Sequence, residues 1–112
     1  MIAVALRLVA HPHAADELRR RVREDLIPAT RAERGCIDYR FYQDIEDPRA
    51  FSFVEEWESR DTLDAHFRSS HVGGFLAALG ELLAEAPVAR FYEVAQAHGL
   101  EAVEQARAEL SA

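Results

Sequence analysis

The residues with the most chemical potential in this sequence lie close together near the middle of the chain. An aromatic strand pattern carries Glu55 and Trp57, the helical pattern after it carries His66, and His71 follows shortly beyond. Side chains alternate across a strand, so Glu55 shares one face with aromatic residues that include Phe53 and Trp57. A carboxylate and an imidazole beside an apolar pocket could move a proton from a bound small molecule.

Histidine is the only side chain in this region whose ordinary pKa, about 6.5, suits proton transfer at neutral pH. The helical spacing of Leu63, His66 and Phe67 places His66 at the edge of an apolar stripe. We therefore expect His66, or alternatively His71, to act as a general base, with Glu55 orienting the imidazole. Structural roles stay open, because His66 could be a hydrogen-bonded core residue and His71 could serve helix capping.

Aromatic and polar residues around these groups are candidates for substrate binding. Phe53, Trp57 and Phe67 would form an apolar wall that stacks on a ring and excludes water, although Trp57 could equally be pure core. Arg40 could bind an anionic substrate group or form a salt bridge in a dimer. The predicted substrate-binding residues are Thr30, Arg40, Phe53, Trp57, Phe67 and Phe75.

The elements that must hold these residues follow from hydrophobic periodicity. Alternating side chains predict strands over residues 2–9, 36–43, 51–57 and 88–95. The polar turn between the second and third strands makes them an antiparallel hairpin.

Helical spacing accounts for the segments between the strands. A first helix is predicted from Ala14 towards Gly35, kinked or ended locally at Pro28. A short helix after Ser59 and a longer one from Val72 to about Ala84 follow the third strand. This order predicts an α+β, ferredoxin-like fold, a four-stranded antiparallel sheet with helices on one face.

Length and charge restrict the class of protein. A chain of 112 residues fits one domain, which we place over residues 1–98, followed by a helical tail over 99–112. The net charge of -7 argues against nucleic-acid and anionic-membrane partners, because phosphate binding needs clustered cations. A single cysteine, with no leader and no membrane-length apolar run, predicts a soluble cytoplasmic protein.

No complete cofactor or metal motif is apparent in the residue spacing. His11 and His13 flank Pro12 in a turn without a third ligand, so a surface loop is expected. Cys36 lacks a histidine partner by sequence, which favours a packed thiol over a nucleophile. We therefore expect no cofactor and no metal.

The second face of the predicted sheet also carries apolar groups. Tyr42, Val54 and either Tyr92 or Val94 are candidates for it, together with Ala3, Ala5 and Val9 or their opposites. A large apolar patch usually marks an association surface. A homodimer in which two sheets pack face to face through this open face is therefore predicted.

A set of short motifs runs through the chain: Thr30-Arg31, Glu33, Gly35-Cys36, Tyr39, Asp47-Pro48, Glu55-x-Trp57-Glu58, His66 and Ser70-His71. Together these motifs resemble the antibiotic-biosynthesis monooxygenase family, especially its quinol-monooxygenase-like branch. The resemblance covers roughly residues 2–96. It departs from the family at Arg34, where a proline is common, and at Val72, where an aromatic is common.

The resemblance implies a dimeric α+β barrel with a small-molecule pocket between the sheet and the helices of each subunit. It also implies oxidation of a quinol, polyphenol or similar small aromatic by O2 without a cofactor. The family is chemically mixed, so the resemblance predicts the fold more firmly than it predicts the reaction. A non-catalytic small-molecule binder or sensor, and a cofactor-free isomerase using the same pocket, are the alternatives.

Overall fold

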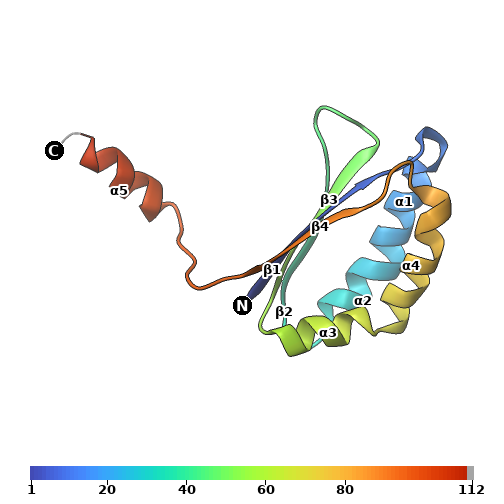
Figure 1. Ribbon diagram of the computed structural model, residues 1–112, viewed down its shortest axis with the longest axis horizontal. Coiled ribbons are helices and arrows are strands. Elements are labelled where there is room, and N and C mark those ends of the chain that lie inside the picture. Colours follow the sequence, from blue (N-terminus) through green and yellow to red (C-terminus); the bar gives the residue numbers. More distant parts are fainter. Residues whose placement is uncertain (111–112) are drawn as a thin grey trace.

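The computed structural model describes residues 1–110 and has the predicted ferredoxin-like α+β architecture (Figure 1). Four antiparallel strands form one sheet in the order β2-β3-β1-β4, and helices cover one of its faces. The strands are β1 (Ile2–Val9), β2 (Cys36–Gln43), β3 (Ala50–Trp57) and β4 (Val88–Glu93). The helices are α1 (Ala15–Arg21), α2 (Ile27–Arg31), α3 (Arg60–Phe67), α4 (Ser70–Leu82) and α5 (Glu101–Glu109).

The first helical segment is interrupted where proline predicts it. A π-helical turn, Val22–Leu26, joins α1 to α2 just before Pro28. Proline has no N–H to donate to the carbonyl one turn earlier, so the regular hydrogen-bond ladder breaks there. The segment nevertheless continues to Arg31, and Leu18, Val22 and Leu26 are buried along one side of it.

Gly35 fixes the connection from α2 to β2. Its φ is +84°, a left-handed conformation that favours glycine. A Cβ at this position would clash with the side chain of Thr62 in the first turn of α3. The backbone carbonyl of Gly35 also accepts a 2.8 Å hydrogen bond from the Glu58 amide. The loop that contains Glu33 is thus held close to α3.

The sheet buries one face against the helices and leaves the other uncovered. Val4, Leu8 and Phe53 point into the core with the aromatic residues Phe51 and Trp57. Register pairing places Val54, Tyr42 and Tyr92 on the opposite face, where each side chain is about half exposed. This assignment decides between the two sets of residues that periodicity left open.

The chain after β4 leaves the body of the molecule. Helix α5 stands away from the sheet, and all of its residues are exposed (Figure 1). The predicted boundary between residues 98 and 99 stays a prediction, and residues 111–112 of the tail lie outside the described part of the chain. Among the helices described for residues 1–110, none is sufficiently long and apolar to span a bilayer.

Candidate active site

Two helix starts set the positions of the histidines. Ser59 caps α3 through a reciprocal pair of hydrogen bonds with Thr62, and Ser69 caps α4 by accepting a hydrogen bond from the Val72 amide. His66 therefore lies near the end of α3, while His71 lies in the first turn of α4. The short break between the helices brings the two rings within 6.0 Å of each other, centroid to centroid.

One carboxylate holds both imidazoles. The Glu33 Oε2 atom lies 2.7 Å from Nδ1 of His66 and 3.0 Å from Nε2 of His71. Ser69 Oγ lies 3.2 Å from the same His71 nitrogen and donates to the His66 carbonyl at 2.6 Å. The expectation that Glu55 orients His66 is wrong: the hydrogen-bonded carboxylate comes from Glu33, on the loop after α2.

His66 is enclosed by aromatic rings. The residue is buried, with the Trp57 ring 4.6 Å away and the Tyr39 ring 5.6 Å away, centroid to centroid. Burial lowers the pKa of His66, and the hydrogen bond that its Nδ1 donates to Glu33 opposes that shift. Burial therefore favours the neutral form of the imidazole. With Nδ1 bonded to Glu33, Nε2 is the ring nitrogen left to accept a proton.

Glu55 has a different partner and a different charge state. Its Oε1 accepts a 3.0 Å hydrogen bond from the Trp57 indole N–H, and its side chain is buried. Burial raises the pKa of Glu55 to about 7, although the indole hydrogen bond opposes the shift. A carboxyl that holds its proton near neutral pH can donate a hydrogen bond as well as accept one.

The raised pKa of Glu55 predicts a pH-dependent stability. The folded protein binds this proton more tightly than the unfolded chain, so the stabilisation is complete below the unfolded pKa of 4.5 and is lost as the pH rises through about 7. Glu55→Gln, which keeps an oxygen for the indole, should be more stable than wild type at pH 8 by about 2 to 3 kcal/mol. Urea unfolding at pH 5 and pH 8 measures the difference.

Glu56 provides the control for this prediction, because it neighbours Glu55 in β3 but points to the opposite face of the sheet. Glu56→Gln should leave the pH dependence of the unfolding free energy close to that of wild type. If Glu55→Gln shows the same loss of stability between pH 5 and pH 8 as wild type, a proton on Glu55 is not the cause.

A small apolar cavity of about 140 Å³ lies between the sheet and the helices, beside the imidazole. Cavities of about this size can hold one benzene ring. Glu55, His66 and Tyr39 supply the polar groups at its wall, and burial raises the pKa of the Tyr39 hydroxyl well above its usual range. The remaining lining residues are Leu6, Leu26, Phe53, Phe67, Val72, Phe75, Leu76 and Leu79.

The predicted substrate-binding residues divide into two groups. Phe53, Phe67 and Phe75 line this cavity as expected. Trp57 and Thr30 are fully buried and lie outside its lining, so Trp57 acts on the site through Glu55 and His66.

The prediction that Arg40 binds the substrate is wrong for this cavity. Its pairing with Val54 places it on the uncovered face of the sheet, where it hydrogen-bonds Asp38 at 3.1 Å. The strand pattern gave no means of telling which face would meet the helices. Arg40 therefore cannot bind an anionic group in this cavity.

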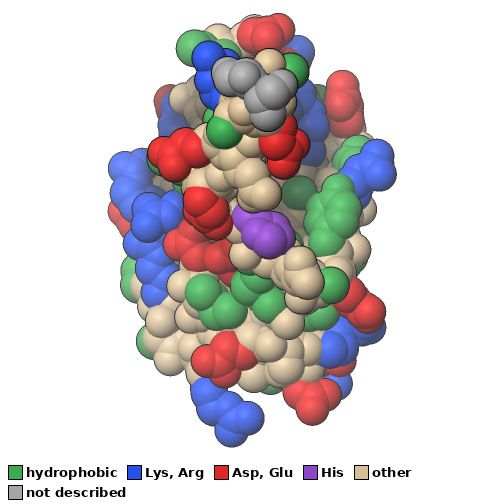
Figure 2. Space-filling view, turned by 90° about the vertical axis from the view of Figure 1, so that its left-hand side faces the viewer, with side chains coloured by type: hydrophobic (Ala, Val, Ile, Leu, Met, Phe, Trp, Pro, Cys, Tyr) green, Lys and Arg blue, Asp and Glu red, His purple; other side chains and the backbone are tan. Residues whose placement is uncertain are grey.

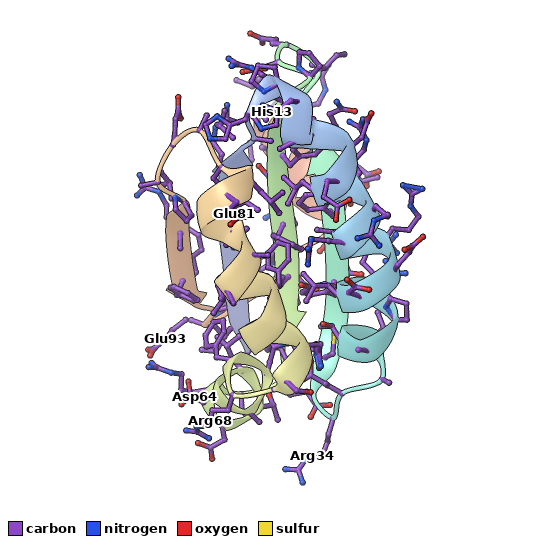
Figure 3. The ribbon with its side chains drawn as sticks, turned by 90° about the vertical axis from the view of Figure 1, so that its right-hand side faces the viewer. His13, Arg34, Asp64, Arg68, Glu81 and Glu93 are labelled. Atoms are coloured by element: carbon purple, nitrogen blue, oxygen red, sulfur yellow. The ribbon has the colours of Figure 1, made fainter. Side chains whose placement is uncertain are left out.

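Phe67 separates the small cavity from a larger one. It lines both the 140 Å³ cavity and a cavity of about 430 Å³ next to β4. The Phe67 ring meets Phe91 of β4 edge-on, with centroids 5.8 Å apart. Asp64 of α3 and Glu93 of β4 lie at the same corner of the molecule and both line the larger cavity (Figure 3). Phe67 is therefore a wall that the two cavities share.

Sequence reasoning gave no role to Glu33 or Tyr39, although both belong to the segments that resemble the family. Glu33 is 33 residues before His66, so spacing cannot connect them. Glu33 lies two residues before Gly35, and a glycine at this point predicts a tight turn after the first helix. That turn is the signal in the sequence that could have drawn attention to Glu33. In Figure 3 the neighbouring Arg34 side chain points away from the body of the molecule.

Comparison with known proteins supports a family assignment. The family model described as antibiotic biosynthesis monooxygenase matches residues 1–78. A Mycobacterium tuberculosis protein named "Putative monooxygenase Rv0793" is 38% identical over 88 residues, which cover 79% of this chain and 84% of that protein. An uncharacterized Synechocystis protein is 34% identical over 77 residues, 69% of this chain, but the match spans only 52% of that relative.

Solved structures support the same family assignment. The structure of the mycobacterial protein superimposes with a TM-score of 0.81 at 30% identity, covering 88% of this chain and 98% of that one. A conserved protein from Methanosarcina mazei gives a TM-score of 0.78 at 32% identity, with coverages of 82% and 90%. The chain therefore belongs to the antibiotic biosynthesis monooxygenase family.

Proposed function

We propose that this protein is a cofactor-independent monooxygenase that oxidises a quinol, polyphenol or similar small aromatic with O2. The observation that carries the proposal is the buried His66 imidazole, held by Glu33 at Nδ1, at the wall of an apolar cavity sized for one aromatic ring. Membership in a family of this name supports oxygen chemistry. The substrate class rests on the cavity and on the resemblance to the quinol branch.

In this reaction the organic substrate supplies the electrons. His66 Nε2 accepts a hydroxyl proton, and Glu33 stabilises the imidazolium that forms. The electron-rich anion then reacts with O2 at a ring carbon, forming a C–O bond and a peroxide anion that takes the proton back from His66. Cleavage of the O–O bond with loss of the ring hydrogen leaves one oxygen on the ring as a carbonyl and releases the other as water.

Glu55 and the aromatic lining complete the site. A protonated Glu55 carboxyl in the cavity wall can donate a hydrogen bond to the charged oxygen of the substrate or to the peroxide. Phe53 and Phe75 keep water away from the anion, and exclusion of water strengthens each of these electrostatic contacts. His71 would keep Glu33 in place through its own hydrogen bond to Oε2.

Oxygen consumption by the metal-stripped protein tests the proposal. Quinols and polyphenols of one and two rings would be compared, with autoxidation subtracted, and the product examined after reaction with isotopically labelled dioxygen. Protein-dependent uptake with one labelled oxygen retained in the product supports a monooxygenase. Ligand protection against thermal unfolding without uptake would overturn it in favour of a binder or sensor, and rearranged product without uptake in favour of an isomerase.

We also propose that two copies of the chain associate through the uncovered face of the sheet. Figure 2 shows this side of the molecule, with the tail towards the viewer and acidic, basic and hydrophobic side chains interleaved. A two-fold contact brings a patch against itself, so a self-complementary patch needs both charge signs. One register row holds Asp38, Glu56, Ala3 and Tyr92, and the next holds Arg40, Val54, Ala5 and Arg90.

A charge placed in the middle of this face should disrupt the dimer. Val54 is 45% exposed and lies between Arg40 and Ala5, so Val54→Arg would add a third arginine to that row and face like charge across the two-fold. We expect the dissociation constant of the dimer to rise about tenfold or more. Light scattering at micromolar concentration measures the change.

Ile45 offers a matched control, because it is 100% exposed in the loop between β2 and β3. Ile45→Arg adds the same charge away from the proposed interface and should leave association unchanged. A wild-type protein that stays monomeric, or a Val54→Arg variant that dimerises as well as wild type, would refute this interface.

A further inference from the structure

We propose that Glu33, His66 and His71 form a binding site for one divalent transition-metal ion, of which Zn²⁺ is the best fit. The three side chains each present a ligand atom, and these atoms all lie within 4.8 Å of one another. The site differs from the substrate cavity, because Glu33 and His71 do not line that cavity. It is assembled from three separate segments: the loop after α2, the end of α3 and the first turn of α4.

The distances suit a small ion. Ligand atoms about 2.0 to 2.1 Å from a tetrahedral or octahedral ion are separated from each other by roughly 2.9 to 3.4 Å. Glu33 Oε2 is 2.7 Å from His66 Nδ1 and 3.0 Å from His71 Nε2. The two histidine nitrogens, which lie within 4.8 Å of each other, would have to approach as the ion replaces the two hydrogen bonds.

The donor chemistry selects the class of ion. Two imidazole nitrogens and one carboxylate oxygen suit zinc and its first-row neighbours, whereas Mg²⁺ and Ca²⁺ prefer sites made of oxygen alone. An imidazole binds an ion through a ring nitrogen that carries no proton, so the proton of a neutral ring must lie on the other nitrogen. The Glu33 carboxylate supplies the negative charge that partly neutralises the ion.

The surroundings provide both an entry path and support. The side chains of Glu33 and His71 are 18% and 19% exposed, while that of His66 is 4% exposed. The ion can therefore approach from solvent past Glu33 and His71 and reach the buried His66. Ser69 Oγ, 3.2 Å from the ligand nitrogen of His71, gives a polar neighbour for a bound water. Three protein ligands leave an open coordination position.

Occupation of this site has a consequence for turnover, which rests on the proposed function. An ion on His66 Nδ1 leaves the proton of the neutral imidazole on Nε2, where it prevents that nitrogen from accepting a proton from a substrate. Zinc would then inhibit a cofactor-free reaction. Metal binding itself does not depend on turnover, so failure of one proposal can be distinguished from failure of the other.

The test is a titration of the chelator-treated, full-length protein with Zn²⁺ by calorimetry, and with Co²⁺ by visible absorption. We expect one ion per chain with micromolar or tighter affinity, Co²⁺ bands displaced by Zn²⁺, and a higher melting temperature with zinc. His71→Ala and Glu33→Gln, measured separately, should each weaken binding at least about tenfold. His71 is chosen over His66 because His66 also lines the substrate cavity, so its replacement would change both sites at once.

His11 and His13 provide the matched control. Their rings stack 5.3 Å apart at the other end of the molecule from Arg34, which neighbours Glu33 (Figure 3). A double variant, His11→Ala with His13→Ala, should bind zinc as tightly as wild type. Absence of binding at millimolar zinc, unchanged affinity in both site variants, or loss of binding only in the double variant would each overturn the proposal.

Discussion

Replacing His66 with alanine is expected to lower oxygen consumption with the best quinol substrate by about 100- to 10,000-fold, the usual contribution of a positioned general base. The reason is that His66 is the only histidine in the described residues whose ring lines the 140 Å³ cavity. Substrate affinity should change far less, because the apolar wall formed by Phe53 and Phe75 remains. Steady-state oxygen uptake and a separate binding titration measure the two quantities.

The binding titration has a built-in probe. Trp57 is the only tryptophan in the chain, and its ring lies 4.6 Å from that of His66, centroid to centroid. A ligand in the cavity should therefore change its fluorescence. Glu33→Gln, which weakens the charge behind the imidazole without emptying the site, should lower the turnover rate by a smaller factor. Equal loss of affinity and turnover in His66→Ala, or no loss of either, would refute the base assignment.

The second large effect concerns Trp57 and stability. Its side chain is fully buried, fills the junction between β3 and α3, and donates to Glu55 Oε1. Trp57→Ala removes this packing and leaves a buried carboxyl without its donor, so the free energy of unfolding should fall by about 3 to 5 kcal/mol. Urea denaturation at pH 5, where Glu55 is protonated in the folded protein, measures the loss.

Trp57→Phe separates packing from hydrogen bonding. It keeps most of the ring volume and loses the indole N–H, so we expect a smaller cost of about 1 to 3 kcal/mol. That cost should grow from pH 5 to pH 8, because the indole hydrogen bond stabilises an ionised Glu55 more than a protonated one. A Trp57→Ala variant as stable as wild type would show that this tryptophan is not a core residue.

These two predictions connect stability with the site. Trp57 binds the carboxyl of Glu55 and packs on the imidazole of His66, so one core residue positions both titratable groups of the cavity wall. Replacement of Trp57 should therefore change the pKa values of Glu55 and His66 as well as the packing of the core. The pH profile of the turnover rate should accordingly differ between Trp57→Phe and wild type at pH values where both proteins are folded.

Much of the fold could be predicted because it depends on local patterns. The strand predictions for residues 2–9 and 36–43 match β1 and β2 at both ends, since alternation of side chains is strong there. The last strand ends at Glu93 instead of residue 95, and the α4 helix ends at Leu82 instead of Ala84. Boundaries are weaker than element types, because the terminal residues of an element have fewer partners.

The sequence by itself determined the order of elements, an interruption of the first helix near Pro28, and the position of an imidazole and aromatic rings near one cavity. These features follow from side-chain period and from the chemistry of single residues. Only the tertiary structure decided which carboxylate meets His66, because Glu33 and His66 are joined through space by the turn at Gly35. It also decided that Arg40 faces away from the cavity, since both faces of the sheet carry apolar groups and only packing against the helices distinguishes them.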